Sequence, residues 1–236
     1  MSEIIMLTNC RVSFPALVEA RSSTEGGQKK FGCDLLIDPA SQDWAKIMQQ
    51  VAATAQEKWG EHANAVLSMI QPDKRLRAFG VGTEKINKKT FAPYDGYPNM
   101  NYVSAASANA PQAIGTDGRP VPSDNTMAYQ AIARKLYGGA YANAAIKFWP
   151  QDNAHGRAIR CELVAIQFNK DGEPFGEGTP DVSSMFGAVA APTPPANPNA
   201  MPAPWGVSPV AMPAPPANPN AMPAPPVNPN IAPWAQ

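Results

Sequence analysis

The feature that most constrains the fold of this chain is the abrupt end of its charged residues. The 236-residue sequence holds 19 Lys and Arg and 19 Asp and Glu, and none of them lies between Ala188 and the C-terminus. Pro, Ala and Asn dominate that final stretch. Such a composition buries too little apolar surface to offset the entropy cost of ordering. The sequence therefore predicts one folded domain over residues 1–187 and a disordered Pro/Ala/Asn repeat tail over residues 188–236.

The tail consists of an internal repeat. The segment PPANPNAMPAP at 194–204 recurs unchanged at 215–225, and a degraded copy, PPVNPNIAPW, begins at Pro225. Repeated prolines predict an extended chain rich in polyproline II. Two interpretations remain open for it. The tail is either a passive spacer that grew by duplication, or a segment that docks on a partner protein through its Trp and Met side chains.

The zero net charge argues against a uniformly basic nucleic-acid-binding protein. It leaves room for a locally basic groove, because binding depends on where the charges lie as well as on their sum. The acidic residues are spread along the chain, whereas basic residues cluster. The clusters are Lys29 and Lys30, then Arg75 and Arg77, then Lys85, Lys88 and Lys89.

The three cysteines indicate a reducing compartment. Cys10, Cys33 and Cys161 are far apart and match no metal-binding or redox spacing. Cys10 and Cys33 lie in apolar, strand-like runs, so we expect buried free thiols. The N-terminus shows no signal-peptide pattern, and no apolar run approaches the ~20 residues that span a bilayer. A soluble, cytoplasmic protein without membrane contact is expected.

No catalytic constellation is visible in the sequence. His62 and His155 each lie on a polar segment, without a second ligand at metal-binding spacing. Neither glycine-rich phosphate-binding motif occurs. The sequence therefore predicts a protein that is not an enzyme and that uses no cofactor and no metal.

Hydrophobic periodicity predicts a mainly β domain. One amphipathic helix is expected over 41–59, with Ser41 as its N-cap and Gly60 as its stop. Residues 72–100 are expected to be irregular, and residues 124–137 to form a short helix or an irregular cover. The predicted strands are 4–14 (closed by Pro15), 30–37, 101–108, 140–149 and 157–168. This pattern indicates an oligonucleotide-binding (OB)-like barrel of five to six antiparallel strands, with one long helix inserted after the second strand.

The segment YANAAIKFW at 141–149 carries aromatic residues on its predicted outer face. Successive side chains of a strand point to opposite faces. Ala142, Ala144, Ile146 and Phe148 then form an inner face, and Tyr141, Asn143, Ala145, Lys147 and Trp149 form the outer one. Outward aromatics beside a lysine are typical of proteins that bind single-stranded nucleic acid, where bases stack on the rings and cations follow the phosphates.

A similar mixture of aromatic and basic residues recurs over 75–102. There Arg75, Arg77, Lys85, Lys88 and Lys89 alternate with Phe79, Phe91, Tyr94, Tyr97 and Tyr102. This segment is either part of a nucleic-acid surface or a solvated charge run whose aromatics pack into the core. The predicted nucleic-acid contacts are Tyr141, Asn143, Lys147, Trp149, Tyr102, Tyr97, Tyr94, Phe91, Lys88, Lys89, Arg75, Arg77, Lys29 and Lys30.

Five segments in a fixed order resemble a family of bacteriophage single-stranded-DNA-binding proteins with an OB-type fold. The segments are RVSFPAL (11–17), KKFGCDLLI (29–37), EKWG (57–60), YGGAYANAAIKFWPQDN (137–153) and NKDGEPFGEG (169–178). The resemblance runs from about residue 4 to residue 186. It implies that the protein coats single strands during phage DNA replication or recombination in the bacterial host cytoplasm. Single-stranded DNA, a phage polymerase, helicase or recombinase, and further copies of the chain in a homodimer or cooperative assembly would be its partners.

The end of the chain departs from what such proteins commonly show. Replication single-strand binders commonly finish in an acidic tail, whereas this chain ends in the uncharged IAPWAQ. An alternative function therefore remains open. The protein could be a non-catalytic structural or protein-interaction β-domain, such as a virion component, with the Pro-rich segment as its linker.

Overall fold

The computed structural model describes residues 3–22, 26–122 and 126–176. They belong to one compact unit, Met1–Val182. The predicted tail over 188–236 and the domain boundary near residue 187 lie outside the described residues and remain predictions. Within the described part of the chain, no helix is long and apolar enough to cross a membrane.

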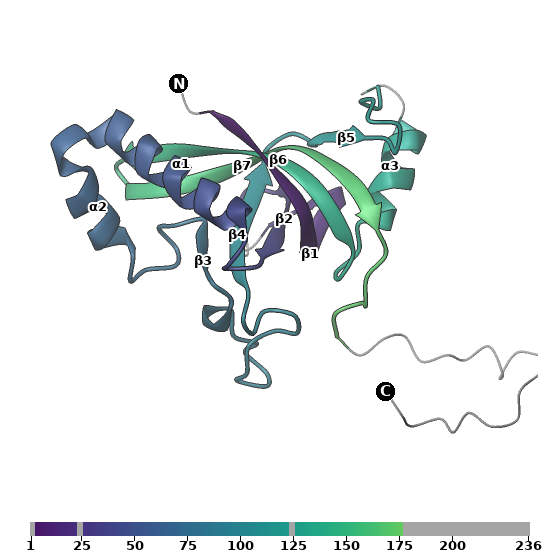
Figure 1. Ribbon diagram of the computed structural model, residues 1–236, viewed down its shortest axis with the longest axis horizontal. Coiled ribbons are helices and arrows are strands. Elements are labelled where there is room, and N and C mark those ends of the chain that lie inside the picture. Colours follow the sequence, from purple (N-terminus) through teal and green to yellow (C-terminus); the bar gives the residue numbers. More distant parts are fainter. Residues whose placement is uncertain (1–2, 23–25, 123–125, 177–236) are drawn as a thin grey trace, which may run out of the picture. The chain divides into compact units, whose positions relative to one another are not determined.

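A seven-stranded sheet forms the body of this unit (Figure 1). Its strands are β1 (Ile4–Arg21), β2 (Lys30–Ile37), β3 (Phe79–Val81), β4 (Asn101–Ser107), β5 (Gln112–Ile114), β6 (Tyr141–Asn153) and β7 (Gly156–Lys170). They follow the order β3-β4-β2-β1-β6-β7-β5. Neighbouring strands are antiparallel except for β5, which pairs in parallel with β7.

A short segment just before β3 closes the sheet into a barrel. Ile159 of β7 accepts a hydrogen bond from the Ala78 amide at 2.9 Å and donates one to the Leu76 carbonyl at 2.9 Å. On its other side, the Ala78 carbonyl accepts from the amide of Ser104 in β4 at 2.7 Å. The predicted OB-like, mainly β fold is therefore confirmed. The sheet has seven strands instead of five to six, because β3 and β5 span only three residues each and leave no readable alternation.

One long helix, α1 (Gln42–Trp59), follows β2, as the apolar stripe predicts. Its N-cap is Ser41, whose hydroxyl accepts a hydrogen bond from the Trp44 amide at 3.3 Å, and Gly60 ends the helix at a φ of 52°. Two shorter helices are present, α2 (Ala63–Ile70) and α3 (Thr126–Lys135). Ile47, Val51 and Ala55 of α1 are fully buried in the core with the inward residues of the strands.

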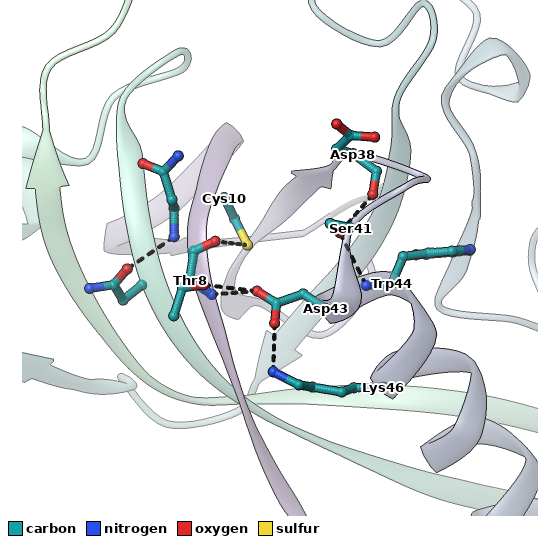
Figure 2. A network of polar contacts seen from close by, with 9 residues as sticks. Thr8, Cys10, Asp38, Ser41, Asp43, Trp44 and Lys46 are labelled. Carbon is teal, nitrogen blue, oxygen red and sulfur yellow. Dashed lines mark hydrogen bonds and ion pairs between the residues drawn. The ribbon is translucent and has the colours of Figure 1, made fainter.

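The first turn of α1 is attached to a bulge in β1 (Figure 2). The amide and hydroxyl of Thr8 donate hydrogen bonds to the Asp43 carboxylate at 2.8 and 3.1 Å, and Lys46 pairs with the same carboxylate at 3.0 Å. Asn9, within the bulge, has a φ of 54°. This contact fixes the start of the inserted helix against the strand that pairs with β6.

The predicted end of the first strand at Pro15 is wrong, since β1 continues to Arg21. The pairing of β1 with β2 is irregular between Ser13 and Ala16, and Phe14 has a φ of 46°. A proline that lacks an amide hydrogen is tolerated at such an irregularity, because no ladder hydrogen bond is required there. The strand therefore bends at Phe14 and Pro15 and then resumes.

The predicted inner face of β6 and the predicted state of the thiols are confirmed, whereas Ala145, which was predicted to face outward, is buried. Phe148 and Ile146 are fully buried, whereas Trp149 is 39% exposed. The cysteines Cys10, Cys33 and Cys161 are free and buried, as expected from their apolar surroundings. Burial and the nearby Asp43 carboxylate raise the pKa of the Cys10 thiol to about 12, so it stays protonated at neutral pH.

Candidate nucleic-acid interface

The loop 82–100 packs on the outer face of β2 and β4. Leu36 of β2 and Tyr102 of β4 point away from the barrel interior, yet both are buried together with Tyr97 of the loop. Tyr94, Met100 and Phe175 pack against these three side chains. The aromatic residues of this segment thus form a small second core on the outside of the sheet.

A polar network lies beside this outer core. One oxygen of the Asp34 carboxylate accepts hydrogen bonds from the Tyr97 hydroxyl at 2.7 Å and from the Lys85 ammonium at 2.9 Å. The other oxygen accepts from the Ser104 hydroxyl at 2.6 Å. Burial, followed by the nearby Asp34 charge, raises the pKa of Tyr97 far above its ordinary value, so the hydroxyl keeps its proton and remains a donor.

An exposed ring borders this network on β1. Phe14 is 52% exposed, and its ring meets that of Tyr94 edge to face, with centroids 4.8 Å apart. The positive φ of Phe14 is costly for a side chain of this size, by about 1–3 kcal/mol. Strain of this kind persists where the surrounding structure enforces it, and it is frequent at ligand contacts.

A groove with a volume of about 430 Å³ runs beside Phe14 across β1, β2 and β4. Phe31 adds a second ring to its lining, and Arg21 and Lys30 add two exposed cations. Asp34 and Ser104 line the groove as well. The groove therefore combines aromatic faces with positive charge, and its acidic group is already paired with Lys85.

A second aromatic and cationic group lies where β1 meets β6. The Arg11 guanidinium lies 5.5 Å from the centre of the Tyr141 ring and 4.3 Å from that of Phe175. Lys170 approaches the Tyr141 ring at 4.6 Å. The Arg11 side chain is fixed by a 2.6 Å hydrogen bond to the Glu173 carbonyl. A groove of about 560 Å³ adjoins Arg11 and Tyr141 and extends towards Lys46 on α1.

Three predicted contacts do not belong to this surface, and we correct them. Tyr97 and Tyr102 are buried in the outer core, so neither ring has a face open to a base. Arg77 is 5% exposed, and its guanidinium pairs with Glu84 at 2.8 Å and donates to the Gln71 carbonyl at 2.7 Å. The sequence could not reveal this burial, because an irregular segment has no periodicity that assigns its side chains to a face.

The remaining predicted residues fall into separate groups. Asn143 is exposed only in part and holds the β1 bulge, since it accepts from the Asn9 amide and donates to Gln167, both at 3.0 Å. Phe91 is 84% exposed at the tip of the loop, near the exposed Lys88 and Lys89. Lys29 and Lys30 are also exposed, and Lys30 borders the 430 Å³ groove.

Trp149 and Lys147 lie towards the other end of β6, away from Tyr141. At about 3.3 Å per residue, Trp149 and Tyr141 are roughly 26 Å apart along the strand. Trp149 is paired with Arg160 of β7, whose guanidinium donates to the Arg75 carbonyl at 2.7 Å. The Arg75 side chain itself pairs with Asp73 at 2.7 Å. The structure thus gathers Arg75, Lys147 and Trp149 at one end and Tyr141 and Tyr94 at the other.

Sequence reasoning missed several residues that line the 430 Å³ groove or surround the Tyr141 ring. They are Arg11, Phe14, Arg21, Phe31, Lys170 and Phe175. The position of Phe14 directly before Pro15 was the one available signal, because a proline often marks an irregularity in a strand. The cation–aromatic contacts of Arg11 bring together three distant parts of the chain, and sequence spacing alone does not indicate them.

The protein is a small barrel whose outer face carries exposed aromatic rings beside arginines and lysines. This arrangement is typical of the class of proteins that bind single-stranded nucleic acid. In the described part of the chain, no group of three His, Cys, Asp or Glu side chains could hold a metal ion. The chain belongs to the family described as "Enterobacter phage Enc34, ssDNA-binding protein", whose model matches residues 3–193. The predicted family is therefore confirmed.

Individual relatives agree with this assignment. A protein designated p50 of Acyrthosiphon pisum secondary endosymbiont phage 1 is 27% identical over 176 residues, which cover 74% of this chain and 87% of p50. The structure of the single-stranded DNA-binding protein from bacteriophage Enc34 in complex with ssDNA is 22% identical, with a TM-score of 0.56. The match covers 73% of this chain and 89% of that chain. A second structure of the Enc34 protein gives 23% identity and a TM-score of 0.53, covering 77% of this chain and 89% of that chain. These two structures support the fold.

Proposed function

We propose that this protein binds single-stranded DNA without sequence specificity and coats it during phage DNA replication or recombination. The observation that carries the proposal is the exposed ring of Phe14 beside the 430 Å³ groove, together with the partly exposed ring of Tyr141 between Arg11 and Lys170. Family membership supports the same conclusion. The protein acts by binding alone and does not catalyse a reaction.

Stacking and charge neutralisation together account for such binding. Each base that stacks on Phe14 or Tyr141 contributes about 1–3 kcal/mol, and every base offers a π-face, so no sequence is preferred. The phosphates of the strand are neutralised by the cationic side chains of Arg11, Lys170 and Lys30. Arg11 and Lys170 already lie against the Tyr141 ring, so they hold it in place while they remain near the path of the backbone.

The outlying candidates form a second zone of contact. Trp149 lies roughly 26 Å along β6 from Tyr141, with Lys147 two residues before it and Arg75 bonded to the neighbouring Arg160, so a longer strand reaches them after it has filled the first surface. The exposed loop tip, with Phe91, Lys88 and Lys89, and the exposed Lys29 add further contacts at the edge of the surface.

The partners that we propose follow from the same role. A coated strand is passed on to a phage polymerase, helicase or recombinase, and neighbouring copies of the chain assemble side by side along it or as a homodimer. The coating of single-stranded DNA and its transfer to these partners take place in the cytoplasm of the bacterial host.

Titration of labelled oligo(dT) at several salt concentrations tests the proposal. We expect the logarithm of the binding constant to fall linearly with the logarithm of the salt concentration, because neutralised phosphates release counterions. Phe14→Ala and Tyr141→Ala should each weaken binding by about 1–3 kcal/mol. Met127→Ala is the matched control, since Met127 is 85% exposed on α3, and it should leave binding unchanged.

Two results would reject this function. One is the absence of oligo(dT) binding at low salt by a folded protein, which would favour the alternative of a protein-interaction domain. The other is binding that does not depend on salt. A duplex of the same length, titrated in parallel, shows whether the surface prefers single strands.

A further inference from the structure

The Asp34 network described above attaches the loop 82–100 to the sheet. We call Asp34, Lys85, Tyr97 and Ser104 the Asp34 latch. Asp34 and Ser104 belong to paired positions of β2 and β4, whereas Lys85 and Tyr97 come from opposite ends of the loop. The Lys85 ammonium also lies 3.0 Å from the Ser104 hydroxyl and 4.4 Å from the centre of the Tyr102 ring. One carboxylate thus holds two separate points of the loop.

Backbone hydrogen bonds close the loop on itself. The Tyr94 amide donates to the Lys85 carbonyl at 3.0 Å, and the Tyr97 amide donates to the Tyr94 carbonyl at 3.1 Å. These contacts define the shape of the loop but leave its docking on β2 and β4 to side chains. The Asp34 latch and the outer core of Leu36, Tyr97 and Tyr102 provide that docking.

The docked loop supports the exposed ring of Phe14. Tyr94 lies three residues before Tyr97, and the centroids of their rings are 6.1 Å apart. The Phe14 ring contacts both, at 4.8 Å from Tyr94 and 6.1 Å from Tyr97. The side of Phe14 that faces the loop is therefore set by where the loop docks, and its free side faces solvent beside the groove.

A carboxylate at the base of this groove requires an explanation, because it repels the phosphates of DNA. We propose that Asp34 is a positioning residue for single-stranded DNA binding, which docks the loop so that Tyr94 holds Phe14 in the orientation that stacks with a base. Lys85 neutralises the charge that this docking introduces. The proposal rests on the proposed function and names a residue that positions one of the rings on which DNA bases stack.

The sharpest probe is Tyr97→Phe, which removes one hydroxyl and leaves the ring in the outer core. The Asp34 carboxylate then loses a donor and the Ser13 side chain loses a partner, and both losses weaken the hold on the loop. Tyr102→Phe is the matched control, because Tyr102 is a buried tyrosine of the same cluster whose hydroxyl bonds to the Arg77 side chain instead of to Asp34. We expect Tyr97→Phe to weaken oligo(dT) binding by about threefold to tenfold and Tyr102→Phe to leave it unchanged.

A double-mutant cycle with Phe14→Ala separates positioning from a merely structural role. In a chain that already lacks the Phe14 ring, Tyr97→Phe should cause a much smaller further loss of affinity, because the ring that it positions is gone and only the contacts of the loop tip remain. Hydrogen exchange should show faster exchange of the amides between Lys85 and Tyr97 in Tyr97→Phe, and not in Tyr102→Phe.

The binding measurements distinguish a failure of the latch from a failure of the proposed function. If the wild-type protein binds oligo(dT) and Tyr97→Phe binds it equally well, the latch proposal is overturned and the proposed function stands. Additive losses in the cycle would also overturn it, since Tyr97 would then act independently of Phe14. If the wild-type protein fails to bind oligo(dT), both proposals fall.

Discussion

Two neighbouring residues of β6 have opposite environments. Phe148 is fully buried in the core, where its ring lies 6.4 Å from that of Phe79, and Trp149 is 39% exposed on the outer face. The sequence predicted this difference because successive side chains of a strand point to opposite faces of the sheet. Four small or apolar residues at alternate positions indicated which face is the inner one. Replacing each of the two residues in turn therefore separates stability from binding.

We expect Phe148→Ala to lower the free energy of unfolding by about 3–5 kcal/mol, because it leaves a cavity in a packed core. Trp149→Ala should keep the fold and weaken single-strand binding by about 1–3 kcal/mol. Urea denaturation and oligo(dT) titration of both variants measure the two effects. A stability loss confined to Trp149→Ala would contradict the face assignment, since it would place the tryptophan in the core.

Other residues of the surface could not be assigned from the sequence. Phe14 lies in a strand whose alternation is broken twice, by the bulge at Asn9 and by its own positive φ. Tyr97 and Tyr102 looked like surface aromatics, yet the loop folds back and buries them on the outside of the sheet. Their burial depends on contacts between distant parts of the chain, and the spacing of residues along one segment carries no information about those.

At the scale of elements, long periodic segments were predictable and short ones were not. The helix α1 shows its apolar stripe, its N-cap at Ser41 and its stop at Gly60 in the sequence. The helix α2 has only eight residues, and β3 and β5 have three each, so periodicity is too brief to read. The sequence also could not show that Pro15 falls at a pairing irregularity, where the strand tolerates it.

The attachment of α1 to β1 should make stability depend on pH. Burial alone would raise the pKa of the Asp43 carboxyl, but hydrogen bonds from Thr8 and Lys46 hold it below its ordinary value. A carboxyl whose pKa is lowered on folding stabilises the fold above its unfolded pKa of about 3.9, and that contribution is lost as the pH falls through the folded value. Asp43→Asn should therefore be less stable than wild type at neutral pH.

Urea denaturation at a series of pH values measures this contribution. We expect the difference between wild type and Asp43→Asn to be about 1.5–3 kcal/mol at neutral pH, as for hydrogen bonds to a charged group, and to shrink as the pH falls below about 4. Glu61→Gln, which removes an acid beyond the other end of the helix, is the control. A difference that stays constant down to pH ~2 would show that the charge of Asp43 does not stabilise the attachment.

At the scale of the whole molecule, the closure of the barrel depends on residues with no strand signal. The segment Leu76–Ala78 lies between a helix and a three-residue strand, yet it hydrogen-bonds to both β7 and β4. Fold class was predictable because the long strands β1, β6 and β7 and the helix α1 carry most of it. The position of the proposed binding surface could be predicted only in part, since closure and loop docking decide which residues share a face.

The charge boundary near residue 187 leads to a prediction for the full chain. In single-strand binders with acidic tails, the carboxylates mimic the DNA backbone and compete with it for the basic groove. Residues 188–236 hold no carboxylate side chain, so this electrostatic competition is not available to them. Steric crowding, an apolar contact through Trp205 or Trp234, and recruitment of another protein are the effects that remain.

We expect a variant that ends near Gly187 to bind oligo(dT) within about threefold of the full chain, a difference of less than ~0.7 kcal/mol. The same variant should lose any binding to replication partners that depends on the tail. Titrations of both chains at the same salt concentration provide the measurement, because the phosphate contacts of the folded domain are common to both. If truncation instead tightened binding tenfold or more, an uncharged chain would have to occupy the groove, and apolar contacts by Trp205 or Trp234 would be the first to test by substitution with Ala.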